Sequence, residues 1–99
     1  MYLYNISMKK FELKRERDEL TKHGDQAKWV EWNEKGWAKE MHDEPAVGRS
    51  LILDPQYMYA YTWLTTEVAE ILEQTSATVK FKTKNSTYTL TNLEPEQTT

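Results

Sequence analysis

The sequence predicts a mainly β protein, either a small curled antiparallel sheet or a partly open SH3-like barrel, with a short charged helix near the N-terminus. Residues 79–91 alternate apolar and polar side chains with period two, as in a strand pair with one buried face. Short apolar runs separated by turn residues recur through residues 25–93, which is typical of small β-rich folds. Because 99 residues support one modest core, we expect a single domain over residues 1–99.

The N-terminal residues 1–24 are expected to form an arm followed by a helix. Residues 1–6 alternate in character, which suits a short strand or an arm lying on another surface. Residues 7–22 are dominated by charge and carry only a thin apolar stripe, which favours a helix of low burial. Gly24 is expected to end that helix, since glycine accepts the left-handed conformation of a C-cap.

Residues 26–42 decide the fold class, because they fit either a hairpin or a helix. As a hairpin, residues 29–32 pair with residues 37–41 around a glycine-ended loop at residues 33–36. As a helix, the segment begins at a cap on Asp25 and buries one apolar face. We favour the hairpin, because the loop residues interrupt a helix and are ordinary turn chemistry.

Three further segments and a tail complete the expected organisation. Residues 50–53 form a short apolar run that predicts a buried strand ended by an Asp-Pro pair. Residues 57–64 predict another strand, and residues 67–73 fit the period of either a strand or a short helix. Residues 94–99 are expected to be a frayed tail.

The hairpin over residues 79–91 also predicts a register. If Asn85 and Ser86 form the turn, Phe81 faces Leu90 and the lysines face threonines across the strands. Each pair then agrees about which face is buried, and a slip of one residue would exchange the faces.

Composition narrows the function classes. Cysteine is absent, which excludes disulfides, thiolate zinc sites and a cysteine nucleophile. The formal net charge of -3 disfavours nucleic-acid binding, which usually requires a basic excess. Neither a signal peptide nor a membrane span is evident, so we expect a cytoplasmic protein. Glycine-rich phosphate loops, paired metal-binding histidines and serine elbows are missing, so we expect no enzyme activity, metal or cofactor.

Four aromatic residues at spacing two form the main candidate for a binding surface. On a strand they would share one face, and apolar residues would occupy the other. A strand that is apolar on both faces needs two covers: its own core, and the N-terminal arm, a second copy of the chain or a foreign partner. The rings therefore either complete the core or anchor a partner. They are Tyr57, Tyr59, Tyr61 and Trp63.

Charged residues provide the secondary candidates. Glu31 and Glu34 belong to an acidic group that could steer a basic partner, although charges of both signs are interleaved along the chain. His42 lies among acidic neighbours, a grouping that could suit a hard cation or a general base, although we favour a solvated acidic loop because contiguous loop residues rarely converge. A basic group could meet phosphates, although its lysines, on the last hairpin, could instead simply keep that hairpin soluble and unaggregated. Its members are Arg49, Lys80, Lys82 and Lys84.

Three segments of the second half resemble small uncharacterised β-barrel proteins encoded by bacteriophages and mobile elements. They are VGRSLIL (residues 47–53), WLTTEV (residues 63–68) and FKTKNSTY (residues 81–88). The resemblance implies no catalytic residues. It implies a small accessory protein of a phage, a class often used to bind and disable host factors.

These observations lead to one main hypothesis and several alternatives. The main hypothesis is a non-enzymatic binding protein that inhibits a host protein, such as a defence nuclease, by occupying its surface in the host cytoplasm. The aromatic residues would anchor the partner and the acidic residues would steer it. The alternatives are a module that sequesters a nucleotide between the rings and the basic residues, a nucleic-acid-binding accessory protein, and a weak enzyme that uses His42.

Overall fold

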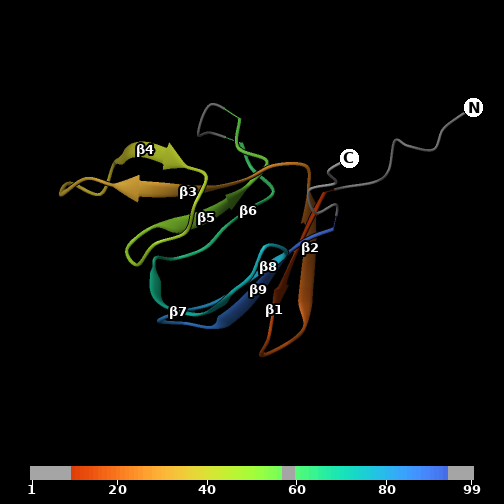
Figure 1. Cartoon of the computed structure of the whole chain (residues 1–99). Helices are drawn as coiled ribbons and strands as arrows, with labels where there is room; N and C mark the ends of the chain where they lie inside the picture. The colour runs from red at the N-terminus through yellow and green to blue at the C-terminus, as the bar shows by residue number, and fades with distance from the viewer. Residues whose placement is uncertain (1–9, 57–59, 94–99) are drawn as a thin grey trace, which may run out of the picture.

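The computed structural model describes residues 10–56 and 60–93, and within them the chain forms two antiparallel sheets (Figure 1). The five-stranded sheet, of order β2-β1-β9-β8-β7, contains β1 (Phe11–Arg15), β2 (Leu20–Gly24), β7 (Val68–Gln74), β8 (Thr78–Thr83) and β9 (Thr87–Asn92). The four-stranded sheet, of order β4-β3-β5-β6, contains β3 (Ala27–Trp32), β4 (Ala38–His42), β5 (Ser50–Leu53) and β6 (Trp63–Leu64). The predicted mainly β class is confirmed, but the described strands remain in two sheets and do not close into a barrel.

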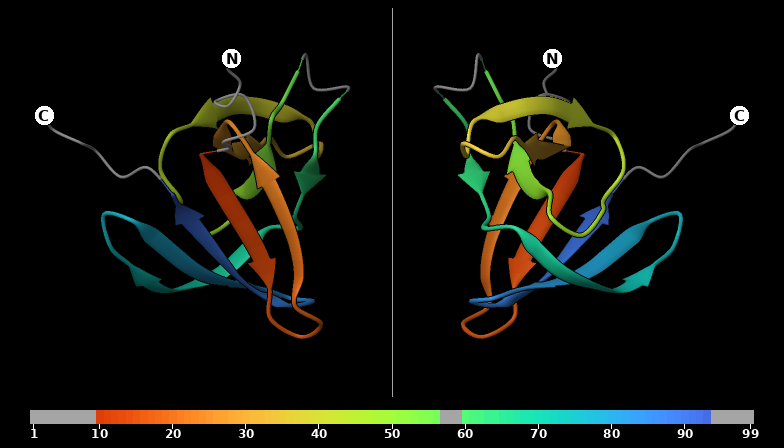
Figure 2. Two further views of the ribbon diagram at one scale, coloured as in Figure 1. Left: turned by 90° about the vertical axis from the view of Figure 1, so that its right-hand side faces the viewer. Right: turned by 90° about the vertical axis from the view of Figure 1, so that its left-hand side faces the viewer.

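The main core lies between the two sheets. Phe81 on β8 is fully buried and packs edge-on against Trp29 on β3, with ring centroids 5.2 Å apart. Tyr88 on β9 stacks on the ring of Phe81, with centroids 5.4 Å apart. Aromatic pairs in these geometries add to the stabilisation from burial. Figure 2 shows that the five-stranded sheet is strongly twisted, so its β7–β8 turn points to one side of the molecule and its β1–β2 turn points down.

The predicted helix over residues 7–22 is wrong in the described part of that segment, where β1 and β2 form a hairpin. Leu13 is buried, and the strand alternates with a period of two that its many charges concealed. Asp18 closes the turn: its carboxylate accepts hydrogen bonds from the Arg15 guanidinium (2.9 and 3.0 Å) and from the N–H of Leu20 (3.2 Å). This capping of the turn prevails over a weak helical pattern. The described residues form no helix, and so none that could cross a membrane.

Gly24, which was expected to cap that helix, instead permits a close approach to Asp54. A Cβ atom on Gly24 would lie 3.0 Å from the Asp54 carboxylate. Oδ1 of Asp54 accepts hydrogen bonds from the N–H groups of Asp25 (2.8 Å) and Gln26 (3.0 Å). These bonds hold the corner at which the chain leaves the five-stranded sheet and enters the other.

The hairpin favoured for residues 26–42 is confirmed as β3 and β4. A short glycine-ended loop connects the strands, and a β-bulge after Glu31 shifts their register. As a result, Glu31 lies directly opposite Glu40, and His42 lies opposite Trp29. The bulge therefore decides which charged side chains meet on this hairpin.

The hairpin predicted over residues 79–91 is confirmed as β8 and β9, with its apolar residues turned to the core. Its predicted register is wrong by two residues, because Phe81 pairs with Tyr88 and not with Leu90. The buried hydroxyl of Thr83 accepts hydrogen bonds from two N–H groups of the turn, at 3.2 Å each, and so places the turn one residue earlier. A shift of two residues leaves every side chain on its predicted face.

The remaining predicted strands have different outcomes. Residues 50–53 form β5, which is buried along its whole length as predicted. Residues 67–73, which allowed either a strand or a helix, are extended from Val68 onward in β7, at one edge of the five-stranded sheet. The expected tail at residues 94–99 and arm at residues 1–6 lie outside the described residues.

The strand predicted over residues 57–64 is confirmed at its end and wrong at Tyr61 and Thr62. Only Trp63 and Leu64 are in a strand, and Tyr61 lies in the connection before them. Gln56 and Ala60 pair through two backbone hydrogen bonds of 2.8 and 3.3 Å. These bonds place Gln56 and Ala60 side by side between β5 and β6, and residues 57–59 lie outside the described residues.

Candidate functional site

The β3–β4 loop has a backbone held by one asparagine. The side-chain oxygen of Asn33 accepts hydrogen bonds from the N–H groups of Lys35 (2.8 Å) and Trp37 (3.0 Å). The N–H of Asn33 donates to the carbonyl of Trp37 (2.8 Å), and its carbonyl accepts from the N–H of Gly36 (2.9 Å). Gly36 has a φ of 83°, which favours glycine. The loop is therefore a rigid turn.

Trp37 is the large hydrophobic side chain that the described residues expose most. About 70% of it is accessible to solvent, although it is attached to the rigid loop just described. Figure 1 shows this loop at the left, where it extends beyond the five-stranded sheet. The exposed indole leaves a large apolar area in contact with water, although the fold does not require it there. Exposed tryptophan side chains of this kind are common at binding surfaces.

A groove of about 640 Å³ lies beside the same loop. One wall is formed by Trp32 and the loop residue Glu34, and the opposite wall by residues 66–69, which lead into β7. Lys84, from the β8–β9 turn, also lines the groove. Charges of both signs therefore lie beside the apolar side chains of this groove, and Glu34 is one of its lining residues.

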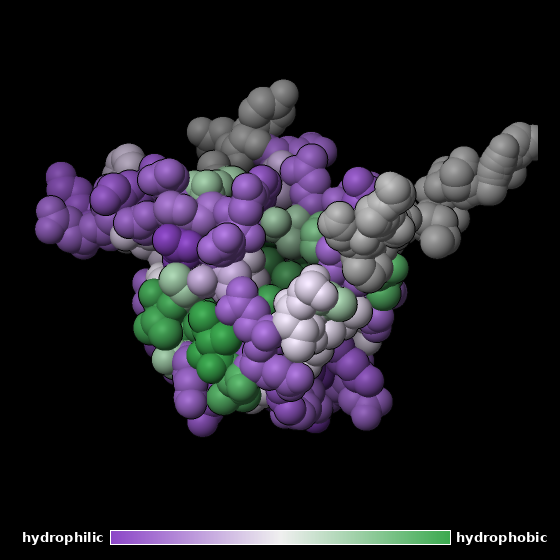
Figure 3. Space-filling view, viewed as in Figure 1, coloured by the Kyte–Doolittle hydropathy of each residue, from purple (hydrophilic) through white to green (hydrophobic). Residues whose placement is uncertain are grey.

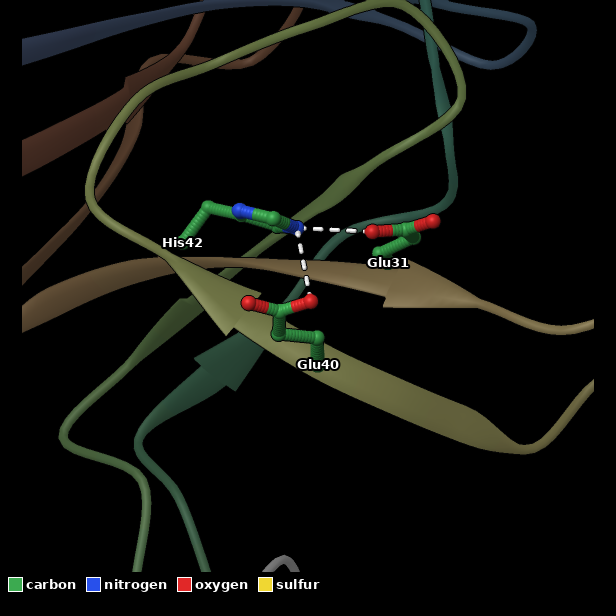
Figure 4. A group of neighbouring side chains, drawn as sticks. All are labelled: Glu31, Glu40 and His42. Carbon is green, nitrogen blue, oxygen red and sulfur yellow. Dashed lines mark hydrogen bonds and ion pairs between the residues drawn. The ribbon is translucent and has the colours of Figure 1, made fainter.

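Three side chains converge on the face of the hairpin (Figure 4). Nε2 of His42 lies 2.7 Å from Oε1 of Glu31 and 4.0 Å from Oε1 of Glu40. Nζ of Lys39 lies 3.5 Å from the other oxygen of Glu31. The hydrogen bond with His42, followed by the charge of Lys39, lowers the pKa of Glu31 below its ordinary value. One nitrogen and two oxygen ligands thus lie close enough together to share a metal ion.

The predicted aromatic surface is not assembled in the described residues. Tyr57 and Tyr59 lie outside them. Tyr61 is 47% exposed in the β5–β6 connection. Trp63 packs against the core, and its ring is flanked by Arg15 at 5.3 Å and Lys22 at 5.4 Å. Trp63 therefore has the core role that was weighed against partner binding.

The predicted basic residues occupy two separate regions. The guanidinium of Arg49, in the β4–β5 connection, donates to the carbonyl of Glu44 at 2.7 Å. Lys80 lies opposite a glutamate of β7 and pairs with Glu16 at 3.8 Å. Lys82 also lies opposite a β7 glutamate, while Lys84 is in the turn. Neighbouring carboxylates interrupt the positive charge that a phosphate would require.

Sequence reasoning missed Trp37 and the convergence around His42. Trp37 had been assigned to a strand or to the face of a helix. The structure instead places it at the end of the hydrogen-bonded β3–β4 loop, where it is exposed. His42 had been placed in an acidic loop, whereas it belongs to β4, where alternate residues share a face. Alternation along a strand would have placed Glu40 and His42 on one face. The β-bulge that brings Glu31 opposite Glu40 has no clear signal in the sequence.

A second concave region lies between the two sheets. Figure 3 shows the surface hollowed there, with hydrophobic side chains at the bottom. The hollow has a volume of about 330 Å³, and Asp43 and Glu44 lie on its rim. Its lining includes the apolar residues Phe11, Ala27, Trp29, Val79 and Leu90, and the polar residues of the β7–β8 turn complete one side.

The fold and these sites define a small two-sheet β protein with an exposed aromatic loop and a mixed histidine–glutamate cluster. Comparison of the chain with protein-family models, with curated proteins and with solved structures found no match.

Proposed function

We propose that the protein is a non-enzymatic binding protein that attaches to another protein through its β3–β4 loop. The observation that carries this proposal is the 70% exposure of Trp37 on a loop whose backbone is fixed by Asn33. Tryptophan is among the side chains that contribute most to protein interfaces. Because the loop is already ordered, binding loses little conformational freedom there.

The surroundings of Trp37 support a protein partner. The groove beside the loop supplies an apolar wall, while Glu34, Lys35 and Lys84 supply polar groups of both signs around it. Protein interfaces commonly combine an apolar anchor with a polar rim in this way. We propose that the partner receives the indole in an apolar pocket. The resemblance to phage-encoded proteins supports a host protein, blocked by this contact, as the particular partner.

The test compares two exposed aromatic residues at opposite ends of the four-stranded sheet. Trp37 follows the end of β3 and Tyr61 follows the end of β5, and these strands are antiparallel. We expect Trp37→Ala to weaken capture of a specific bacterial protein at least tenfold in quantitative pull-down, and Tyr61→Ala to leave it unchanged. Circular dichroism should show that both variants remain folded.

Two results would contradict the proposal. Loss of capture in Tyr61→Ala alone would assign the anchor to the aromatic segment predicted from the sequence. Equal capture by the original protein and by folded Trp37→Ala would show that the β3–β4 loop does not bind the captured protein.

The hollow between the sheets favours a second candidate function, the sequestration of a small apolar ligand. Its volume of about 330 Å³ lies at the lower end of the range of small-molecule sites, and two aromatic side chains, Phe11 and Trp29, are part of its lining. Acidic residues on its rim disfavour a phosphate, so the ligand would not be the nucleotide considered from the sequence. Titration with a fluorescent apolar dye, repeated with Ala27→Leu to fill the hollow, would test this function: we expect the substitution to reduce dye binding.

A further inference from the structure

We propose that Glu31, Glu40 and His42 bind one divalent transition-metal ion of the Zn²⁺ type. This site is independent of the proposed protein binding, since it uses other side chains of the β3–β4 hairpin. No metal was expected from the sequence, because His42 was assigned to a loop whose acidic neighbours rarely converge on one ion and no second set of ligands was visible. The strand register assembles the ligands instead from two chain segments that are nine residues apart, at Glu31 and Glu40.

The register of the hairpin creates a need for positive charge. Glu31 and Glu40 lie directly opposite each other on antiparallel strands. Two like charges in this position destabilise a sheet. Nζ of Lys39 lies 3.5 Å from Oε2 of Glu31. The Oε1 atoms of Glu31 and Glu40 are instead directed toward the imidazole of His42. A cation at this point would compensate both carboxylates.

The donor atoms suit zinc better than a hard ion. Mg²⁺ and Ca²⁺ prefer oxygen ligands alone, whereas an imidazole nitrogen is a common ligand of Zn²⁺. Bonds of about 2.0–2.2 Å in a tetrahedral site place neighbouring ligand atoms about 3.3 Å apart. The distances from Nε2 of His42, 2.7 Å to Glu31 and 4.0 Å to Glu40, bracket that separation. Small side-chain rotations would therefore complete three ligands, with water as the fourth.

The backbone positions the ligands before any ion binds. Both strands belong to the four-stranded sheet, and His42 lies opposite Trp29, a fully packed core residue. Figure 4 shows Nε2 of His42 directed between the two carboxylates. The remaining flexibility is that of side chains, which favours a single defined site.

The chain provides a matched control in its other histidine. His23 on β2 is exposed and also lies opposite a glutamate, Glu12 on β1. The clusters of histidine and carboxylates that could hold an ion in the described residues do not include this pair. His23→Ala therefore removes a histidine that also lies on a strand, without touching the proposed site; His23 is more exposed than His42.

The experiment is calorimetric titration of the full, untagged chain with ZnCl₂ at neutral pH. We expect one-to-one saturable binding, at least tenfold weaker in His42→Ala and in Glu40→Gln, and unchanged in His23→Ala. MgCl₂ should give no binding heat. The ring-nitrogen resonances of His42 should shift on addition of Zn²⁺ while those of His23 stay in place.

Three outcomes would overturn the site. The first is the absence of saturation at millimolar Zn²⁺, and the second is an equal loss of affinity in His23→Ala. The third is full affinity in Glu40→Gln, a substitution of similar size at an exposed position that should not disturb folding. Circular dichroism of each variant identifies any loss that comes from unfolding.

Discussion

The β3–β4 and β8–β9 hairpins have the same topology but distribute their side chains differently. In β8–β9, every apolar residue faces the core, and the strand lysines face threonines or glutamates. In β3–β4, a tryptophan remains in solvent and two glutamates face each other. The first hairpin satisfies each rule of sheet stability, whereas the second breaks two of them. Local violations of this kind are expected at functional positions, because function and stability select different residues there.

The largest effect should distinguish the two hairpins by stability. Phe81→Ala removes a fully buried ring that contacts Trp29 and Tyr88, and should lower the free energy of unfolding by about 3–5 kcal/mol. Trp37→Ala should change it by less than about 0.5 kcal/mol, since the indole is mostly in solvent. Urea unfolding measures both values. A large loss in Trp37→Ala would show that the indole stabilises the fold, and would remove the reason for assigning it to binding.

The two turns offer a smaller effect of similar origin. Thr83 in the β8–β9 turn accepts hydrogen bonds from two N–H groups, as Asn33 does in the β3–β4 loop. Thr83→Val should cost about 1–2 kcal/mol by leaving partly buried donors without their partner, whereas Asn33→Ala should cost less, about 0.5–1 kcal/mol, because water can reach the exposed donors of its loop. Asn33→Asp retains the acceptor and is the control.

The same pair of variants separates stability from binding. Asn33→Ala should also weaken partner capture, because Trp37 is then presented by a loose loop, whereas Thr83→Val should not. Thermal unfolding and pull-down on the same samples provide the comparison. Equal effects of both variants on capture would mean that general stability, and not the loop, controls binding.

The comparison also explains what could be predicted from the sequence. The strand pattern of β8–β9 is consistent at every residue, so its faces were predicted even though its register was two residues off. The side chain of Thr83 determined that register through contacts of a kind that periodicity does not report. The β1–β2 hairpin was missed because charges on its outer face hid a period of two around Leu13.

The candidate site was less predictable than the fold. The hairpin that carries it was expected, and Glu31 and Glu34 were selected from it. Their different positions depend on the β-bulge after Glu31. The bulge places Glu31 within hydrogen-bond distance of His42, whereas Glu34 lies beside the groove. Solvent exposure could not be predicted from the sequence either. Trp63 and Trp37 are the same residue type, and only the folded structure shows that Trp63 packs against the core and Trp37 does not.

The β1–β2 turn provides the smallest effect and a test of whether turn chemistry matters at exposed sites. Hydrogen bonds from Arg15 lower the pKa of Asp18 to about 2 from 3.8. A carboxyl group whose pKa is lower in the folded state stabilises the protein above its unfolded pKa, and that stabilisation is lost as the pH falls through the folded value. Stability of the original protein should therefore decrease between about pH 4 and pH 2 more steeply than that of Asp18→Asn.

Urea unfolding at several pH values measures this difference. The contribution should be small and should shrink further in salt, since Asp18 and Arg15 are accessible to solvent and ions screen exposed pairs. The variant Asp43→Asn is a useful comparison, because Lys28 on β3 likewise lowers the pKa of Asp43, which directly follows β4. If both variants flatten the pH dependence equally, charge pairing alone accounts for it. A larger effect of Asp18→Asn would show that the hydrogen bond from the N–H of Leu20 to Asp18, which closes the turn, contributes in addition to the charge pair.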